Sequence, residues 1–483
     1  MVGIVSYGAY IPKFRIDRKI IYQAMGWFDG GTYQPGEKAV ANFDEDSISM
    51  AVNSTYDCLT DIDSKAMDAL FFATTTAPYK ERLNSEIIAT ACDLRNDIRS
   101  ADYSNSVKAG STALLAAIDS VKAGSAKNVV VAAADCRVAK PGSSQEEFFG
   151  DSAASLVIGE DNIIANFVGS HSVSYDFPDC WKSSTDQYHR QWEDRFIRTE
   201  AYSKFILEAI SGLVKKTELD INSVSKVVFP CLYPGDFKKI GKMLGLGLEK
   251  LQDPMIANVG YTGASNSLML LTAALEGAKP GDKIIVASFG SGSDALLFEV
   301  TEEIEKIKGN RRGTKKHLAA KKALTSYEKM LAFRDILPIE KGIRGETAGT
   351  FTSFSTAWRE RKLVMALYGS KCQACGTPQI PAQRICVNPD CGTVDQMEPY
   401  KFTGKKATIF TYTGDNLAYT PSPPAIYCIA DFEGGGRYWF DITDVDLDAV
   451  EVGMEIEPTF RMKYKDDKLG MHIYFWKMQP IMQ

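Results

Sequence analysis

From Met1 to about Glu302, short apolar or β-branched runs alternate with Ala-rich stretches whose apolar residues recur at helical spacing. Several of the runs are apolar throughout, as strands buried on both faces of a sheet are. This alternation predicts a layered α/β domain. The predicted strands are VGIVSYGAYIP, DALFFATT, KNVVVAAAD, SAASLVIG, KVVFPCLY and KIIVASFG, and the predicted helices span residues 47–59, 84–94, 110–123, 199–215, 237–244 and 265–275.

The two halves of this domain look alike. Each half contains a strand, a helix that opens on small residues, and a further strand that follows a turn with Lys and Gly. The small residues are Ala109-Gly110-Ser111-Thr112 in the first half and Gly263-Ala264-Ser265 in the second. The pattern favours an internal duplication.

The composition changes near Thr301, where a charged stretch (TEEIEKIKGNRRGTKKHLAAKKAL) begins. Charge runs of this kind are usually solvated, so we interpret it as a linker helix rather than a functional basic patch. Further helical pattern continues to Tyr368, and from Lys405 onward strand-rich, turn-punctuated segments predict a small β-barrel. The predicted domains are an α/β domain at residues 1–302, a charged helical linker at 303–368, a metal-binding segment at 369–395 and a barrel at 396–483.

Length and charge exclude several classes of protein. A chain of 483 residues is too long for one core. Its 55 Lys and Arg against 61 Asp and Glu argue against a dedicated nucleic-acid binder or a polybasic membrane-surface protein. No apolar run approaches the roughly 20 residues that span a bilayer, and the start has no signal-peptide pattern. We therefore expect a soluble, cytoplasmic protein with no nucleic-acid or membrane partner.

Four of the ten cysteines lie close together in one short segment. Two turn-flanked pairs of this kind fold their thiolates toward one point, giving tetrahedral sulfur coordination that suits Zn²⁺, with iron the less favoured occupant. Two chance pairs of buried thiols are the disfavoured alternative, because the segment is short and rich in turns. Four cysteine ligands leave no position open for water, so we expect a structural metal. The predicted ligands are Cys372, Cys375, Cys386 and Cys391.

The C-terminal part resembles a known pair of domains. The run that begins at Trp358 (WRERKLVMALYGSKCQACGTPQIP), the second cysteine pair, Pro423-Pro424 and Gly436-Arg437 are similar to the rubredoxin-like zinc ribbon and OB-fold barrel that accompany thiolase-like acyl-CoA enzymes. The resemblance implies a module that helps to assemble the enzyme or to accommodate the CoA-linked substrate. OB barrels also bind nucleic acid, an alternative that the acidic balance of the chain disfavours.

The N-terminal domain resembles the 3-hydroxy-3-methylglutaryl-CoA synthase branch of the thiolase superfamily over nearly all of residues 1–300. The resemblance implies a duplicated five-layer α/β/α/β/α domain that forms two-fold homodimers. The segments that carry it are Gly3 to Pro12, Thr74 to Tyr79, Asn105 to Leu114, Asp135 to Gly142, Phe149 to Ala154, Val228 to Pro234, Asn258 to Gly263 and Ser288 to Ser293.

The catalytic residues of that family are not retained. Its nucleophile is a cysteine at a helix N-terminus, where the helix dipole lowers the thiol pKa, and the matching residue here is Val107. The family's acidic general acid/base matches Thr75, and its histidine matches Pro230. Ser106 is a weaker candidate nucleophile that we expect to cap the helix, and Cys231 is expected in the core. None of the four histidines lies near a matching motif, so each is expected on the surface or in a satisfied hydrogen bond: His171, His189, His317 and His472.

An acyl-CoA pocket without acyl-transfer residues remains. The resemblance makes Gly292 and Ser293, with the backbone at Val107, the predicted oxyanion hole. Steroid side-chain aldolases, which are similar and use tyrosines in place of the cysteine, suggest Tyr261 and Tyr233 as proton carriers. Asp236 is a third candidate proton carrier. Asn258 is the candidate for the family's asparagine, although it lies one residue farther from the tyrosine than usual. The candidates for binding the CoA phosphates are Lys238, Lys239 and Lys242, unless they only form a solvated helix face.

A polarised thioester without a nucleophile suits aldol chemistry on a 3-hydroxyacyl-CoA, because the enolate needs an oxyanion hole and the hydroxyl needs a base. We therefore expect an enzyme that makes or breaks a carbon-carbon bond in a CoA thioester without a covalent acyl-enzyme. Two alternatives stay open. One is a condensing acyltransferase with a displaced nucleophile, and the other is a non-catalytic acyl-CoA-binding scaffold that partners a thiolase.

Overall fold

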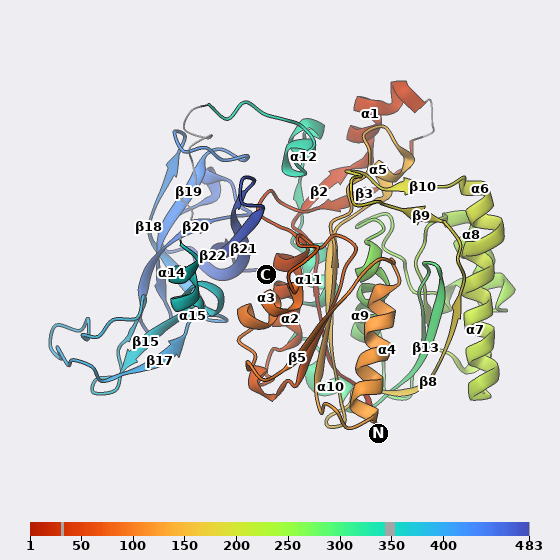
Figure 1. The fold of residues 1–483 in the computed structure, drawn as a ribbon, viewed down its shortest axis with the longest axis horizontal. Coiled ribbons are helices and arrows are strands. Elements are labelled where there is room, and N and C mark those ends of the chain that lie inside the picture. Colours follow the sequence, from red (N-terminus) through yellow and green to blue (C-terminus); the bar gives the residue numbers. More distant parts are fainter. Residues whose placement is uncertain (30–32, 343–352, 483) are drawn as a thin grey trace. The chain divides into compact units, whose positions relative to one another are not determined.

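The computed structural model describes residues 1–29, 33–342 and 353–482, and the chain divides into two units (Figure 1). The segment predicted as a linker is shared between them, with residues 303–330 in unit 1 and 331–368 in unit 2; residues 343–352 lie outside the described part. Unit 1 comprises Met1–Ala41, Asp46–Ala89 and Leu94–Met330, and unit 2 comprises Asn42–Glu45, Thr90–Asp93 and Leu331–Gln483.

A nine-stranded mixed sheet forms the frame of unit 1, in the order β11-β12-β13-β8-β1-β7-β6-β4-β5. β1 pairs with β7 along most of its length, but it meets β8 only at Gly3 and Ile4. The sheet therefore has two parts joined by this short contact. Its strands are β1 (Gly3–Tyr10), β4 (Ala69–Ala73), β5 (Arg99–Tyr103), β6 (Val129–Asp135), β7 (Ser152–Gly159), β8 (Ala165–Ser174), β11 (Lys226–Val228), β12 (Lys283–Ala287) and β13 (Gly292–Val300).

Layers of helices alternate with the two parts of the sheet, which gives five layers (Figure 1). The central helices α4 (Ala109–Lys122) and α9 (Asn266–Gly277) contact each other between the two parts of the sheet. A Cβ on Gly110 would lie 2.4 Å from the Ala264 carbonyl oxygen, so glycine permits this close approach. The outer helix α2 (Ser47–Cys58) covers β1, β6 and β7, and α7 (Ser203–Thr217) covers β8 and β13. The predicted α/β/α/β/α architecture is confirmed.

Shorter elements complete unit 1. A three-stranded sheet has the order β14-β2-β3, and β9 and β10 form a small hairpin. The bounds of these strands are β2 (Phe14–Asp17), β3 (Glu37–Val40), β9 (Cys180–Trp181), β10 (Arg190–Gln191) and β14 (Lys322–Ala323). The further helices are α1 (Arg18–Asp29), α3 (Asn84–Ala91), α5 (Ser144–Phe148), α6 (Asp194–Phe196), α8 (Pro234–Met243), α10 (Ile304–Ile307), α11 (Gly313–Ala319) and α12 (Tyr327–Phe333). The last of them, α12, runs across the unit boundary.

Unit 2 contains a small three-stranded sheet and a closed barrel. The barrel follows the order β18-β19-β20-β22-β21, with β18 pairing back to β21 and β20 parallel to β22. A five-stranded closed barrel is compatible with the predicted OB fold. The elements are α14 (Phe354–Arg359), α15 (Arg361–Ala366), β15 (Tyr368–Cys372), β16 (Pro378–Gln379), β17 (Met397–Lys401), β18 (Ala407–Asp415), β19 (Ala425–Phe432), β20 (Arg437–Ile442), β21 (Glu455–Asp466) and β22 (Met471–Pro480).

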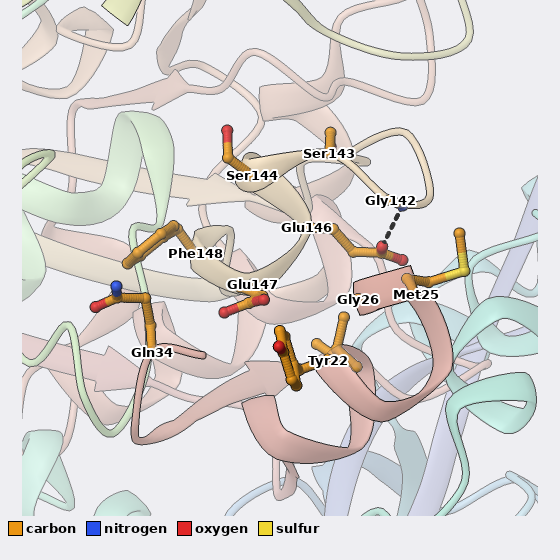
Figure 2. Close-up of a pocket in the computed structure, with 11 residues that line it drawn as sticks. Tyr22, Met25, Gly26, Gln34, Gly142, Ser143, Ser144, Glu146, Glu147 and Phe148 are labelled. Carbon is orange, nitrogen blue, oxygen red and sulfur yellow. Dashed lines mark hydrogen bonds between the residues drawn. The ribbon is translucent and has the colours of Figure 1, made fainter. Parts of the chain in front are cut away.

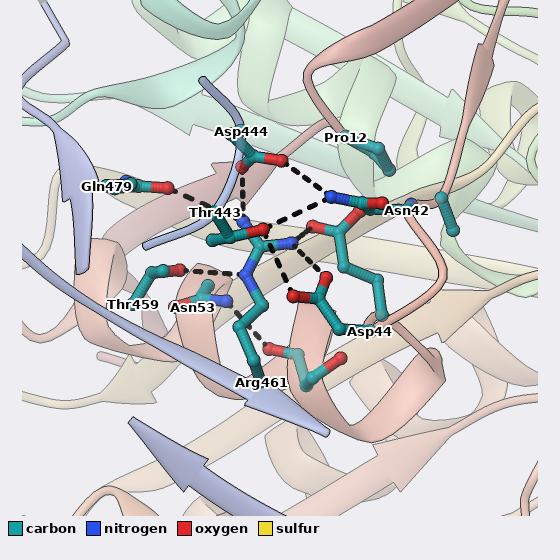
Figure 3. A network of polar contacts seen from close by, with 12 residues as sticks. Pro12, Asn42, Asp44, Asn53, Thr443, Asp444, Thr459, Arg461 and Gln479 are labelled. Carbon is teal, nitrogen blue, oxygen red and sulfur yellow. Dashed lines mark hydrogen bonds and ion pairs between the residues drawn. The ribbon is translucent and has the colours of Figure 1, made fainter. Parts of the chain in front are cut away.

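A buried ion network lies inside unit 2 (Figure 3). The guanidinium of Arg461, fully buried, contacts the carboxylates of Asp44, Glu45 and Asp444, with 2.6 Å to Asp444 Oδ2. Lys477 Nζ lies 2.8 Å from Asp44 Oδ2. The early segment Asn42–Glu45 therefore supplies two of the acidic groups that face the buried cations of the barrel. Within the described part of the chain, no helix combines the length and the apolar character that crossing a bilayer requires.

Candidate functional site

The turn before α4 holds Val107, the residue that the sequence motif predicts in place of the family's nucleophile. Val107 is half-buried there and packs in a small apolar cluster with Phe149 and Tyr261. Ser106 Oγ donates to the Gly290 carbonyl oxygen at 3.1 Å and accepts from the Lys108 N–H at 3.3 Å. The Ser106 hydroxyl thus holds the turn together, but the predicted capping role is wrong, because the N-cap residue of α4 is Lys108 and no side chain in the described part of the chain accepts a cap hydrogen bond there.

The glycine-rich loop before β13 packs directly on this turn. A Cβ on Gly290 would lie 2.8 Å from both Val107 Cγ2 and Ser106 Oγ. Ser293 Oγ donates to the Ser288 carbonyl oxygen at 2.6 Å, and Gly292 pairs with Ser174 of β8. The two predicted oxyanion residues are thus the first two residues of β13, and Ser293 also closes the loop on itself. Among the described residues, no hydrogen bond is recorded from the backbone N–H of Val107.

Thr75 and Pro230, which the sequence motifs predict in place of the family's acid/base and histidine, have structural contacts. Thr75 Oγ1 donates to Asp135 Oδ2 at 2.9 Å, and Asp135 also accepts from the Ala264 N–H at 2.7 Å. The Pro230 carbonyl oxygen accepts from the Tyr202 hydroxyl at 2.6 Å. The contacts of Asp135 join β6, the loop after β4 and the turn before α9, and neither Thr75 nor Pro230 supplies a base.

Tyr261 is only 4% exposed and lies between Phe149 and the Val107 turn. Burial raises the pKa of its hydroxyl above the usual value, although the cation of Arg137 acts in the opposite direction. Tyr261 therefore stays protonated at neutral pH and can donate a proton rather than accept one.

The remaining predicted residues have partners elsewhere or are exposed. The Tyr233 hydroxyl donates to Asp194 Oδ1 at 3.1 Å, and burial followed by that carboxylate raises its pKa. Asp236, in the first turn of α8, pairs with Arg198 at 2.6 Å. Asn258 is exposed, and so are the three lysines on α8, namely Lys238, Lys239 and Lys242. The contacts described above join Val107, Ser106, Tyr261 and the loop in one cluster.

Two groups near Tyr261 were not singled out from the sequence. Arg137, 3% exposed, lies over the Phe149 ring at 4.2 Å and the Tyr261 ring at 5.7 Å. Its Nη2 lies 3.4 Å from His189 Nδ1. His189 therefore differs from the surface or fully satisfied histidine expected from the sequence. The one sequence signal for this cluster is that an arginine, Arg137, lies in the segment from Asp135 to Gly142, which carries the family resemblance.

The thiols near the site are poor nucleophiles. Burial raises the pKa of Cys231 to about 12, and the nearby carboxylate of Asp253 adds to the shift. Burial also raises the pKa of Cys180. A thiol reacts as the thiolate, so neither group is activated at neutral pH.

A cavity of about 210 Å³ lies between α1 and α5 (Figure 2). None of the residues that line it is a predicted site residue. Glu146 is held by the Gly142 N–H and the Tyr327 hydroxyl, each at 2.7 Å. Glu147 points into the cavity, and its Oε2 has no hydrogen-bond partner among the described residues. The lining is acidic, which does not suit the phosphates of CoA.

Replacement of Glu147 by glutamine is expected to raise the thermal midpoint slightly at pH 7.5. Burial raises the pKa of Glu147 in the fold, with Arg18 opposing the shift, so the ionised form is the penalised one. The loss of stability caused by the ionised Glu147 carboxylate grows as pH rises through the carboxyl pKa and vanishes at pH values below that pKa. We expect a gain on the order of 1 °C at pH 7.5 that disappears near pH 4 in scanning fluorimetry. The exposed Glu160→Gln should show no such pH dependence, and an equal gain at both pH values would contradict the assignment.

The four clustered cysteines form a candidate metal centre in unit 2. Their Sγ atoms all lie within 4.8 Å of one another. Cys372 Sγ and Cys391 Sγ are 3.8 Å apart, and Cys375 Sγ and Cys386 Sγ are 3.5 Å apart. Tetrahedral Zn–S bonds of about 2.3 Å require sulfur separations of about 3.8 Å. Gly376 and Gly392, with φ of 76° and 56°, make the turns after each pair. The residues therefore fit a metal ion held by four sulfurs.

Comparison with known proteins decides the family. No profile of a known protein family matches the chain. The hydroxymethylglutaryl-CoA synthase of Caldivirga maquilingensis is 33% identical over 352 residues, which cover 71% of this chain and 99% of the relative. The chain belongs to the hydroxymethylglutaryl-CoA synthase family. The Methanopyrus kandleri member is likewise 33% identical, over 316 residues, 64% of this chain and 90% of the relative.

Solved structures agree on the fold. A hydroxymethylglutaryl-CoA synthase complexed with CoA superposes with a TM-score of 0.61 at 17% identity, over 73% of this chain and 94% of that one. The 3-oxoacyl-[acyl-carrier-protein] synthase III of Aquifex aeolicus superposes with a TM-score of 0.56 at 19% identity, over 62% and 100%. Unit 1 is therefore thiolase-like, as the sequence motifs predicted.

Proposed function

We propose that this member of the hydroxymethylglutaryl-CoA synthase family acts on CoA thioesters and makes or breaks a carbon-carbon bond by aldol chemistry, without a covalent acyl-enzyme. Family membership supports an acyl-CoA condensing enzyme of the thiolase superfamily. The observation that supports the non-covalent mechanism is Val107, an aliphatic residue on the turn before α4, where the sequence motif predicts the family's nucleophile. Ser106, Cys180 and Cys231 do not replace that nucleophile, for the reasons given above.

In the cleavage direction, a base removes the proton from the 3-hydroxyl group, and the bond between C2 and C3 breaks. C3 leaves as a carbonyl compound, and the electron pair moves into an enolate whose negative charge develops on the thioester oxygen. N–H groups at the start of α4, beginning at Val107, lie where the helix dipole stabilises such a charge. Protonation of C2 then gives the shorter acyl-CoA. In the condensation direction, the protonated Tyr261 hydroxyl supplies the proton to the new alkoxide.

We further propose that the cysteine cluster holds Zn²⁺ with a structural role, because four sulfur ligands complete a tetrahedral shell. Cys372, Cys375, Cys386 and Cys391 would each supply one ligand. Zinc would fix the two knuckles of unit 2 relative to each other and take no part in the reaction.

Incubation with acetyl-CoA is expected to leave no acyl group on the wild-type chain in intact-mass spectrometry. Val107→Cys is expected to convert a majority of chains to the acyl adduct, because a thiol at this helix N-terminus has a lowered pKa. Val107→Ala is the matched control that enlarges the same space without a nucleophile. A stable adduct on the wild-type chain would overturn the non-covalent mechanism.

Turnover tests the reaction itself. The purified chain is expected to release a carbonyl compound and a shorter acyl-CoA from 3-hydroxyacyl-CoA thioesters such as 3-hydroxybutyryl-CoA and 3-hydroxy-3-methylglutaryl-CoA. Turnover should survive Val107→Ala. No turnover of any thioester in either direction would overturn the proposal and favour the scaffold alternative.

A further inference from the structure

An ion pair lies directly beside Val107, at the start of α4. Lys108, the N-cap residue of that helix, places its Nζ atom 3.2 Å from Oδ1 of Asp294 in β13. The Asp294 side chain is only 3% exposed and the Lys108 side chain 15%. A carboxylate buried this deeply requires a charged partner, and Lys108 supplies one.

Hydroxyl groups extend this pair into a network that reaches from the helix to the glycine-rich loop. Ser111, in the first turn of α4, donates from Oγ to Asp294 Oδ2 at 2.7 Å, and its Oγ also lies 2.7 Å from Ser288 Oγ. The Asp294 N–H donates to Ser288 Oγ at 3.2 Å. Ser288 and Asp294 flank residues 289–293, so both ends of the loop are fastened to the first turn of α4.

The loop and the turn that carries Val107 are in direct contact beside this network. A Cβ on Gly290 would lie 2.8 Å from Val107 Cγ2 and 3.1 Å from the Lys108 backbone N. The ion pair bridges the same two segments, because Lys108 belongs to the turn and Asp294 to the strand that leaves the loop. An oxyanion hole stabilises charge most when its donors are fixed before the reaction, and such a bridge fixes them.

The pair also controls the charge near the start of α4. Without Lys108, the Asp294 carboxylate would stand uncompensated beside the first turn of the helix. It would then repel a second negative charge that develops at the helix N-terminus. Lys108 offsets this repulsion while Asp294 keeps the lysine side chain in place.

We propose that Lys108 and Asp294 are a pair of positioning residues for the thioester enolate, which hold the Val107 turn against the glycine-rich loop and keep the start of α4 favourable for negative charge. This inference rests on the proposed function, because it assumes that the thioester oxygen lies at this helix start. Neither residue transfers a proton in this role.

Exchange of the C2 protons of acetyl-CoA for deuterium tests the pair. The C2–H bond breaks to give the enolate, and a deuteron from the solvent then adds to C2, so that NMR in D2O follows the reaction on the full chain. Lys108→Met is expected to lower kcat for exchange about 10- to 100-fold, less than the roughly 100- to 1,000-fold that follows loss of an oxyanion donor itself. KM should stay within about twofold, as for an interaction that acts in the transition state.

Two further variants separate positioning from folding. Lys108→Arg keeps the cation and should recover most of the exchange rate. The double variant Lys108→Met with Asp294→Asn has no unpaired carboxylate in the network, so it should fold even where Lys108→Met does not, and its rate should lie between those of Lys108→Met and the wild type.

Lys122→Met is the matched control, because Lys122 is an exposed lysine in the last turn of the same helix. It should leave the exchange rate unchanged. A wild-type rate in Lys108→Met or in the double variant, or a loss that Lys108→Arg does not recover, would overturn the positioning role alone. Absence of exchange by the wild-type chain would instead overturn the proposed enolate chemistry.

Discussion

Replacement of Cys372 by serine is expected to remove the metal from the cysteine cluster and to unfold the ribbon around it. Cys372 is fully buried and ends β15, so its loss opens the coordination shell from the inside. Apparent binding free energies of structural zinc are on the order of 10–16 kcal/mol, and this energy stabilises the folded ribbon. We expect the metal content to fall from about one zinc per chain to near zero, measured by inductively coupled plasma mass spectrometry.

Cys428→Ser provides the control, because Cys428 is a buried barrel cysteine outside the cluster. It should retain its metal, although the buried hydroxyl can lower stability. Limited proteolysis should then cleave Cys372→Ser between residues 369 and 395, and wild-type chain treated with a chelator should give the same fragments. Full zinc content in Cys372→Ser would contradict the four-sulfur site, and stoichiometric iron in the wild type would contradict the choice of metal.

Replacement of Arg461 by methionine is expected to destabilise unit 2 by about 3–5 kcal/mol, because buried carboxylates then lose their main cation. Arg461 is 0% exposed and faces Asp44, Glu45 and Asp444. Urea unfolding followed by tryptophan fluorescence measures the loss. Arg437→Met is the comparison, since Arg437 pairs with Asp431 at the surface and such pairs contribute about 0–1 kcal/mol.

The same network predicts a dependence on pH. Burial alone would raise the pKa of Asp44, but Lys477 and Arg461 more than offset it and hold the pKa below its usual value. A lowered carboxyl pKa adds stability above the unfolded-state pKa of about 3.9, and this stability is lost as pH falls through the folded-state pKa. Arg461→Met should therefore move the acid unfolding midpoint to higher pH. Adding Asp444→Asn should recover part of the lost stability, and equal losses for the Arg461 and Arg437 variants would contradict this account.

The sequence was sufficient for the elements whose pattern is local. The apolar run in KNVVVAAAD became β6, buried at every position, and the predicted helix at residues 265–275 became α9. β13 was not among the predicted strands, although most of Gly292–Val300 is buried. β8 and β5 were missed because Ala165–Ser174 and Arg99–Tyr103 are rich in polar residues and only partly buried. Their hydrogen-bond partners β13 and β4 define them as strands, and pairing between distant segments leaves no mark in the local pattern.

The candidate site likewise contains features that the sequence could predict and features that it could not. The cysteine cluster could be predicted because its ligands lie within one short segment and zinc chemistry fixes their spacing. The assignment of Val107 to the nucleophile position rests on its motif and stays a prediction. The Arg137 and His189 pair could not be predicted, because 52 positions separate the two residues and the β9 and β10 hairpin brings the histidine to the arginine. The lysines on α8 satisfied the charge requirement of a phosphate site but stand on an exposed helix face.

Asp44 and Glu45 belong to unit 2 but lie early in the chain, and this limits how the protein can be divided into fragments. A fragment of residues 331–483 would contain Arg461 and Lys477 but not two of the acids that neutralise them. It would also lack Asp93, whose carboxylate accepts from the Tyr368 hydroxyl at 2.8 Å. The barrel is therefore not a transplantable module. A chimaera that exchanges it for the barrel of another protein must carry residues 42–45 and 90–93 with it, and an insertion in either segment is expected to lower the stability of unit 2.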